Sequence, residues 1–280
     1  MDSSNLIDNK PLRTHKRLDD IINNYNEYME LDSKVGAVVL AAGHGTRMKS
    51  GIPKMMHTLA GKPLVGHVVD AVISSKCCAK PVVVVSADGA LVREYLGSRV
   101  DYVVQEQQLG TGHAVAQART LLEHTADHVV VLYGDMPFVQ PQSIASLVER
   151  HEERGNSITL MTITVPHFEN EFSSFAGFSR IIRDEKTGHI VRDVQAKDCT
   201  KEELEIHEVN PCYFCFNAPW LWNHIDQLDN NNAQEEYYLT DLLHMAIDSG
   251  EPISSISIEP QEARGVNTKE DLALAKQVLS

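Results

Sequence analysis

Glycines and basic residues follow one apolar segment in the first fifth of the chain. Residues 35–40 are apolar, as in a buried strand, and Gly43 and Gly45 come shortly after them. Glycines let successive backbone N–H groups turn toward one point, and such a group of amides binds anions. Arg47 and Lys54 add positive charge to the same loop. The segment therefore predicts an anion-binding loop at the end of a strand.

This loop differs from two common phosphate-binding motifs. No Gly-Lys-Ser/Thr closes it, as a Walker A loop requires, and Met48 stands where the dinucleotide-binding fingerprint has its third glycine. Kinase and dehydrogenase interpretations are both disfavoured. Because glycines in a strand-to-helix turn are often only structural, other motifs must decide the function.

Further motifs follow in order along the chain. They are QEQQLGTGHA at residues 105–114, LYGDMP at 132–137, NNNAQ at 230–234, YYLTD at 237–241 and GVN at 265–267. Together with the glycine loop they resemble the uridylyltransferase domains of bacterial N-acetylglucosamine-1-phosphate uridylyltransferases, which belong to the nucleotide-sugar pyrophosphorylases. The resemblance runs from about residue 35 to the C-terminus. Enzymes of this family transfer a nucleotidyl group from a nucleoside triphosphate to a sugar 1-phosphate.

The resemblance implies a UTP site. Its nucleotide-binding residues would be Leu40, Ala42, Gly43, Gly45, Thr46, Gln105, Gly110 and Thr111, and its catalytic cations Arg47 and Lys54. Cations aimed at the phosphates stabilise the charge that develops during transfer. Uracil presents an N3–H donor between two carbonyl acceptors, and Gln105 is the candidate to recognise it. His113 is expected to be a helix residue and not a catalytic base.

The same resemblance implies a magnesium site. Asp135 comes directly after a predicted strand and Gly134, and a carboxylate there suits a hard cation. By resemblance, Asn267 is the second protein ligand. For each residue an alternative stays open, since Asp and Asn also serve as helix N-caps.

The acceptor side departs from the family pattern. By resemblance, the sugar-binding residues are Gly177, Gln195 and Asn210. However, Ser179 stands where a glycine is usual, Gln195 where a glutamate is usual, and Pro211-Cys212 where threonine-glycine is usual. Because Gln195 carries no charge and Pro211 has no N–H, hydrogen bonding to the sugar must differ. The identity of the sugar is therefore left open.

The composition restricts the class of protein. A chain of 280 residues can bury a large core, and its net charge of −14 disfavours binding to nucleic acid or acidic membranes. No apolar run approaches the ~20 residues of a membrane span, and the polar N-terminus lacks a secretory apolar segment. We therefore expect a cytoplasmic protein without a nucleic-acid or membrane partner. The odd number of five cysteines predicts reduced thiols.

The order of the predicted elements explains how these motifs could meet. Strand-like and helix-like segments alternate over residues 35–133, which predicts an α/β fold with a doubly wound, mostly parallel sheet. Ligands of such sheets bind beyond the carboxyl ends of the strands, where the glycine loop, Gln105 and Asp135 all fall. The resemblance specifies the Rossmann-like nucleotidyltransferase form of this fold.

Two regions extend the predicted sheet. From about residue 173, shorter strands predict a small β-rich acceptor lobe, and the apolar run 209–216 predicts one strand of it. Apolar residues at helical spacing on one face predict an amphipathic helix within residues 1–34, ahead of a nucleotidyltransferase domain at 35–280. This extension could pack on the domain or mediate contact between copies.

These features favour a magnesium-dependent UTP:N-acetylglucosamine-1-phosphate uridylyltransferase. The hexapeptide repeats of the family's acetyltransferase half are absent from the sequence, so uridylyl transfer alone is expected. Two alternatives stay open. A nucleotidyltransferase for another sugar phosphate or phosphate acceptor is disfavoured by Gln105 and its motif. A non-catalytic sugar-nucleotide sensor is disfavoured by the presence of Arg47, Lys54 and Asp135. The oligomeric state is not predicted.

Overall fold

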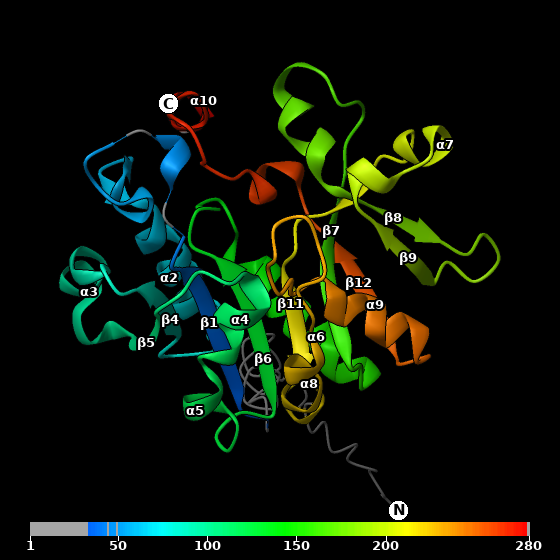
Figure 1. Cartoon of the computed structure of the whole chain (residues 1–280), viewed down its shortest axis with the longest axis horizontal. Coiled ribbons are helices and arrows are strands. Elements are labelled where there is room, and N and C mark those ends of the chain that lie inside the picture. Colours follow the sequence, from blue (N-terminus) through cyan, green and yellow to red (C-terminus); the bar gives the residue numbers. More distant parts are fainter. Residues whose placement is uncertain (1–32, 44, 49, 279–280) are drawn as a thin grey trace, which may run out of the picture. The chain divides into compact units, whose positions relative to one another are not determined.

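The computed structural model of the chain describes residues 33–43, 45–48 and 50–278. The predicted N-terminal extension lies outside these residues, except for its last two positions. Among the described residues, ten strands form a mixed sheet in the order β5-β4-β1-β6-β11-β7-β10-β8-β9, with β12 beside β7 (Figure 1). The α/β class and the β-rich lobe predicted from the sequence are both confirmed.

The half of the sheet that holds the glycine loop is parallel. Its strands are β1 (Val35–Ala41), β4 (Val82–Ser86), β5 (Asp101–Gln105) and β6 (His128–Tyr133). β1 lies between β4 and β6, and it is apolar throughout because both faces of this part of the sheet are covered. The carboxyl ends of the four strands therefore share one edge.

Two apolar cores lie on opposite faces of this sheet. On one face, α2 (Leu64–Ser74) and α6 (Pro141–Arg154) pack against Ala37 and Val39 of β1. On the other, α4 (Thr111–Ala116), α8 (Ala218–His224) and α9 (Asp241–Asp248) pack against Val38 and Leu40. Neighbouring residues of a strand point to opposite faces, so one strand supplies both cores.

The second half of the sheet is antiparallel, apart from β12. Its strands are β7 (Ile158–Thr164), β8 (Ser179–Arg183), β9 (Ile190–Val194), β10 (Glu208–Asn210), β11 (Phe214–Asn217) and β12 (Ile253–Ser257). β12 runs parallel to β7. We call β8, β9 and β10 the acceptor strands.

The prediction of one strand over residues 209–216 is wrong. β10 and β11 are separated at Pro211 and Cys212, where proline has no N–H to donate and Cys212 takes a left-handed φ of 66°. Both strands pair with β7, but β10 also pairs with β8 whereas β11 also pairs with β6. The chain therefore changes its second partner at this break, and the acceptor strands separate there from the parallel half.

Smaller elements complete the fold. They are α3 (Ala90–Leu96), α5 (Arg119–Leu122), α7 (Lys201–Leu204), α10 (Lys269–Val278), the hairpin of β2 (Thr58–Leu59) and β3 (Lys62–Pro63), and the 3-10 turns η1 (Thr46–Met48), η2 (Lys54–Met56) and η4 (Asn170–Gly177). α4 and α5 follow each other closely in the chain as two separate helices. Within the described ranges, no helix has the length and apolar character needed to cross a membrane.

Candidate active site

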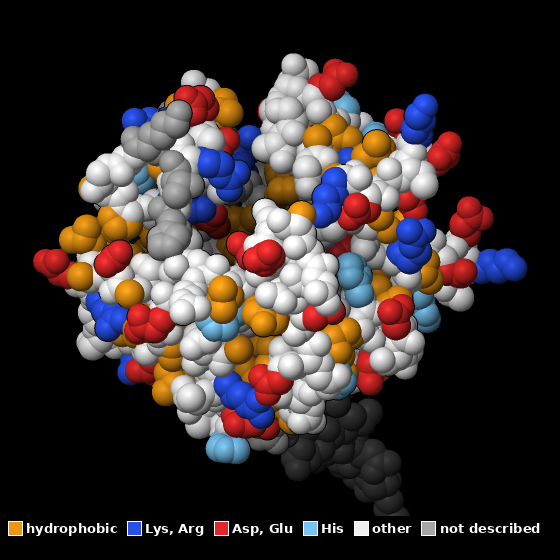
Figure 2. All heavy atoms as spheres, viewed as in Figure 1, with side chains coloured by type: hydrophobic (Ala, Val, Ile, Leu, Met, Phe, Trp, Pro, Cys, Tyr) orange, Lys and Arg blue, Asp and Glu red, His pale blue; other side chains and the backbone are white. Residues whose placement is uncertain are grey.

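A cavity of about 230 Å³ lies at the carboxyl ends of β1, β5 and β6. The predicted residues that line it are Leu40, Ala42, Gly43, Lys54, Gln105, Gly110, Thr111 and Asp135. In the space-filling view, a hollow opens between the region that carries α10 and the lobe that carries β8, with basic and acidic side chains at its walls (Figure 2). The parallel strands thus bring the nucleotide motifs to one place, as predicted.

Gln105 is held at the buried end of β5. Its Nε2 donates a hydrogen bond to the carbonyl of Gly110 at 3.0 Å and lies 3.1 Å from Nδ1 of His113. Its amide oxygen has no hydrogen-bond partner in the described part of the chain. His113 lies in α4 and orients Gln105, which agrees with its assignment as a helix residue. The amide oxygen of Gln105 is therefore available to accept a hydrogen bond from a base.

Gly110 packs directly against a distant motif. Its φ is 104°, and a Cβ atom at this position would lie 2.5 Å from the carbonyl oxygen of Tyr237. The backbone N–H of Tyr237 donates to Leu109, and that of Leu239 donates to Oγ1 of Thr111. Only glycine fits this contact, which connects the YYLTD segment to the loop after β5.

Four residues that bear charged or amide side chains meet beside the cavity. Lys54 forms an ion pair with the carboxylate of Asp135, and its Nζ donates to Oδ1 of Asn267 at 3.1 Å. Nη2 of Arg47 donates to the same Oδ1 at 3.0 Å. The side chains of Lys54 and Asp135 are only 10% and 15% exposed. We call these four residues the ion cluster, in which charges interact more strongly than in water.

Backbone contacts position Asp135 and Asn267. Asp135 follows β6, and its carbonyl accepts a hydrogen bond from Val266 at 2.8 Å. Thr268 caps the last helix, because its Oγ1 accepts from Asp271 N–H while the Asp271 carboxylate accepts from the N–H groups of residues 267 and 268. The side chain of Asn267 is therefore not the cap of α10, and it faces the cations.

The oxygen atoms of the cluster fit a hard cation. Since Nζ of Lys54 contacts both Asp135 and Asn267, the two side chains face a common point, and carboxylate and amide oxygens are ligands that magnesium accepts. Within the described residues, no group of three or more His, Cys, Asp or Glu side chains could hold a metal. An ion here would complete its coordination with phosphate oxygens and water.

The glycine loop touches the cluster through Gly45. This residue has a left-handed φ of 61°, and a Cβ atom on it would lie 2.4 Å from Cβ of Lys54. Gly45 therefore allows the loop to lie against Lys54. A Cβ atom on Gly43 would have open space around it, and the backbone of Thr46 begins η1. Residue 44 is outside the described residues.

The predicted sugar-binding residues lie around the acceptor strands and do not line the cavity. Gly177 ends η4, Gln195 follows β9 and is half-buried, and Asn210 ends β10. Asn210 is buried, and its Oδ1 accepts a hydrogen bond from Cys212 N–H at 2.7 Å. Their role in sugar binding stays a prediction.

The structure gives a reason for two departures from the family pattern. The hydroxyl of Ser179 hydrogen bonds to the buried carboxylate of Asp193, whose Oδ2 also lies 3.4 Å from Nδ2 of Asn210. Burial raises the pKa of Asp193 above its usual value. The N–H that Pro211 lacks is replaced by that of Cys212, which holds Asn210. These residues thus form an internal polar network beneath the predicted acceptor site.

The sequence analysis missed five residues that line the cavity: the apolar Met55 and Ala114, and the polar Gln108, Tyr133 and Glu236. Tyr133 is half-buried, and desolvation raises the pKa of its phenol, which bonds to Thr111, well above its usual value, so the phenol stays protonated. Gln108 and Tyr133 lie inside motifs named above, and Glu236 directly precedes one. Their place in those motifs was the available signal, but motif membership alone does not tell which side chains face a ligand.

Comparison with known proteins agrees with this geometry. The model of the MobA-like NTP transferase domain matches residues 37–237, which include most of β1, all residues that line the cavity and three of the four residues of the ion cluster. The chain belongs to this family. It is a nucleotidyltransferase of the MobA-like class, and its Rossmann-like fold is confirmed.

Relatives and solved structures refine the comparison. Bifunctional protein GlmU of Clostridium novyi is 39% identical over 243 residues, and that of Symbiobacterium thermophilum 41% over 246, each across 87% of this chain. The chain spans about half the length of these relatives, 52% and 50% respectively. A UDP-glucose pyrophosphorylase complexed with UDP-glucose has a similar fold, with a TM-score of 0.67, 17% identity and coverage of 87% of this chain and 97% of its own.

Proposed function

We propose that this chain catalyses uridylyl transfer from UTP to N-acetylglucosamine 1-phosphate in the cytoplasm, and that it releases UDP-N-acetylglucosamine and pyrophosphate. The observation that carries the proposal is the ion cluster at the edge of a cavity in which Gln105 keeps a free amide oxygen. The resemblance of the motifs supports the choice of sugar.

Gln105 would recognise uracil. Because Nε2 of Gln105 is engaged by Gly110 and His113, its oxygen can accept from the N3–H of uracil. Cytosine has a lone pair at N3 and would leave this buried oxygen unpaired, which disfavours CTP. Leu40, Ala42 and the glycine of the following loop would form an apolar wall for the base and ribose.

The reaction requires neutralisation of charge more than proton transfer. The oxygen of a sugar phosphate attacks the α-phosphorus of UTP, the bond to the bridging oxygen breaks, and pyrophosphate leaves with the electron pair. A phosphate monoester with a second pKa near ~6 is mostly a dianion at neutral pH and needs no base. Arg47, Lys54 and the backbone N–H groups of Gly43, Gly45 and Thr46 would hold the phosphates in line and stabilise the charge on the leaving group.

Magnesium would be held by Asp135 and Asn267. The ion, when bound, neutralises phosphate charge. Lys54 now contacts both side chains, and it would move its ammonium toward a phosphate when the oxygens bind a metal. The acceptor would lie against Gly177, Gln195 and Asn210, with Asp193 orienting the amide of Asn210.

A screen of substrates tests this proposal. Release of pyrophosphate would be measured with ATP, CTP, GTP, UTP and TTP against N-acetylglucosamine, glucose and galactosamine 1-phosphates and N-acetylgalactosamine 1-phosphate, with and without magnesium. We expect turnover with UTP and N-acetylglucosamine 1-phosphate only when magnesium is present. If another sugar 1-phosphate is preferred, that compound replaces N-acetylglucosamine 1-phosphate as the proposed acceptor. Binding of UDP-sugars without turnover of any pair of nucleotide and sugar phosphate would instead favour a non-catalytic sugar-nucleotide sensor.

A further inference from the structure

A second hollow, larger than the cavity that contains Gln105, is lined by none of the residues of the ion cluster. It has a volume of about 780 Å³, which is within the usual ~300–1,000 Å³ of small-ligand pockets. Residues of α6, the turn between β8 and β9, the end of α9, and β12 line it. It shares no lining residue with the cavity that contains Gln105. We call it the arginine groove.

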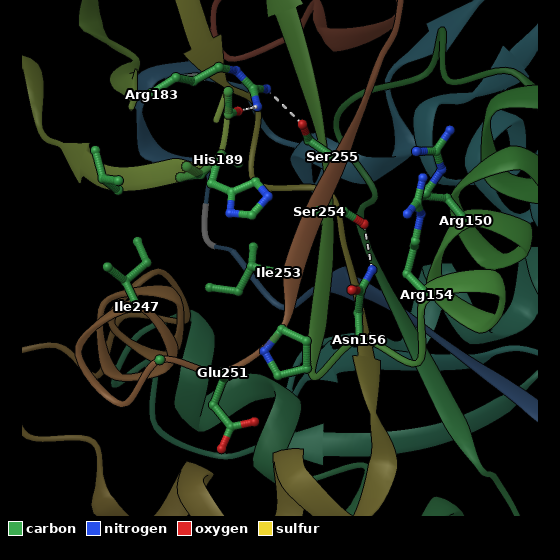
Figure 3. Close-up of a pocket in the computed structure, with 15 residues that line it drawn as sticks. Arg150, Arg154, Asn156, Arg183, His189, Ile247, Glu251, Ile253, Ser254 and Ser255 are labelled. Carbon is green, nitrogen blue, oxygen red and sulfur yellow. Dashed lines mark hydrogen bonds between the residues drawn. The ribbon is translucent and has the colours of Figure 1, made fainter. Parts of the chain in front are cut away.

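Two arginines on one wall of the groove lack strong partners. Arg150 and Arg154 are four residues apart on α6, and their guanidinium groups lie close together beside β12 (Figure 3). Among the described residues, Arg150 forms one ion pair, with Glu153 at 3.9 Å, and Arg154 forms no hydrogen bond or ion pair. Like charges at this spacing on a helix repel each other. In a chain with 39 acidic and 25 basic residues, two neighbouring arginines without strong acidic partners are unexpected.

The opposite wall of the groove is polar, but the charge of its arginine is already paired within the protein. Arg183 forms a bidentate ion pair with Glu208 and donates to Ser255 and to the carbonyl of Gly188. His189 lies beside it and is exposed (Figure 3). Because Arg183 has used most of its donors, the unsatisfied positive charge of the groove lies at Arg150 and Arg154.

The floor adds hydroxyl and apolar surface. Ser254 of β12 points toward Asn156, and Ile247 and Ile253 lie on the side of His189 (Figure 3). The carboxylate of Glu251, the acidic residue of the lining, accepts a hydrogen bond from Ser157 and points away from the two arginines (Figure 3). The carboxylate of the lining is thus kept away from an anion at the arginines, while an attached organic group could contact the isoleucines.

We propose that the arginine groove is a second ligand site, which binds a phosphorylated small molecule. Two guanidinium groups match the double charge and the oxygen geometry of a phosphate monoester, and each can donate two parallel hydrogen bonds. The apolar side chains across β12 bind the organic part. This site does not depend on uridylyl transfer, since it uses none of the residues of the ion cluster.

The test measures binding by calorimetry to the full chain in the Arg47→Ala/Lys54→Ala background, which weakens phosphate binding at the other site. The probes are glucose 6-phosphate, ribose 5-phosphate, adenosine monophosphate and inorganic phosphate. Glucose, ribose and adenosine are the neutral controls, and glucuronate replaces the phosphate with a single negative charge. We expect at least one organic phosphate to bind saturably, and its neutral or carboxylate counterpart to bind at least ~10-fold more weakly.

Substitution then locates the binding. Arg150→Gln/Arg154→Gln should weaken it at least ~10-fold, while Arg93→Gln/Arg99→Gln, which removes two arginines outside both cavities, should leave it unchanged. Arg154→Gln alone, at an exposed position, provides a variant that removes no contact within the described fold. Crystals soaked with the bound probe should show the phosphate between the two guanidinium groups. The proposal is wrong if no probe binds, if glucuronate binds as well as its phosphate counterpart, or if binding survives the loss of both arginines.

Discussion

The proposed nucleotide side and the proposed acceptor side of this protein are built from different halves of one sheet. The cavity that contains Gln105 and the ion cluster lie at the ends of parallel strands β1, β5 and β6. Gln195 and Asn210, in contrast, lie at the ends of short antiparallel strands. On the first side, no departure from the family pattern was noted in the sequence. The second departs at Ser179, Gln195 and Pro211.

The difference follows from what each side must recognise. Phosphates and a divalent cation require full charges at fixed distances, so under the proposed function we expect neutral replacements of Lys54 or Asp135 to lose binding or rate. Sugar hydroxyl groups both donate and accept hydrogen bonds, so several arrangements of amides and hydroxyls can hold them. The nucleotide side should therefore tolerate substitution poorly, and the acceptor side better.

The largest effect is expected at Asp135. Asp135→Asn replaces a charged oxygen ligand with a neutral one and removes the partner of Lys54, so kcat should fall about 10³-fold, or ~4 kcal/mol, with the fold intact. Asn267→Ala should cause a smaller loss. Pyrophosphate release at varied magnesium concentration measures both, with Asp184→Asn, in a surface turn, as the control. Unchanged magnesium dependence in the Asp135 variant would exclude this metal site.

Arg47 and Lys54 should come next. Replacing either with alanine removes a cation from the phosphates, and we expect kcat to fall about 100-fold. Lys62→Ala, which breaks a half-exposed ion pair with Asp70, is the matched control and should retain activity. If Arg47→Ala raises only the KM for UTP, then Arg47 binds the ground state and does not stabilise the transition state.

Gln105 should affect selectivity more than rate. In Gln105→Ala the hydrogen-bond acceptor for uracil N3–H is lost, so the preference for UTP over CTP should fall about 10-fold. The ratio of kcat/KM values in competition assays measures this, and Gln108→Ala, at a neighbouring residue of the same cavity, tests whether any lost amide has the same effect. Unchanged preference would mean that backbone groups alone recognise the base.

The smallest effect is expected on the acceptor side. Gln195 is half-buried and its side chain forms no hydrogen bond with the described residues, so Gln195→Glu can be accommodated without breaking a contact. A charged acceptor strengthens bonds to sugar hydroxyls, and kcat/KM for N-acetylglucosamine 1-phosphate should hold or rise. A loss of about 10-fold or more would show that the sugar presents an acceptor to the Gln195 amide, and would count against N-acetylglucosamine.

The parallel half of the sheet could be predicted because short, local patterns in the sequence identify its strands. The apolar runs 35–40 and 129–133 mark buried strands, and the parallel arrangement then places Gln105 and Asp135 at one edge. The contact between Gly110 and Tyr237 could not be predicted, since it joins segments 127 residues apart through backbone atoms that carry no residue-specific pattern.

The break between β10 and β11 was missed for a related reason. Residues 209–216 are almost wholly apolar, and a pattern of this kind reports burial but not partners. Pro211 was noted as a departure from the family, yet the left-handed φ of Cys212 depends on the exchange of β8 for β6, which only the tertiary structure specifies. The bond from Cys212 N–H to Asn210, which holds the turn, likewise appears only in the fold.

This exchange of partners has a consequence for the range of substrates that the fold can serve. Each of the acceptor strands is three to five residues long. Under the proposed function, a few side chains on these strands therefore specify the surface that faces the acceptor. Changes there need not alter the spacing of β1, β5 and β6. Under the proposed function, we therefore expect a chain of this design to exchange one acceptor for another through few substitutions while its triphosphate chemistry stays the same, so that the two halves could be engineered separately.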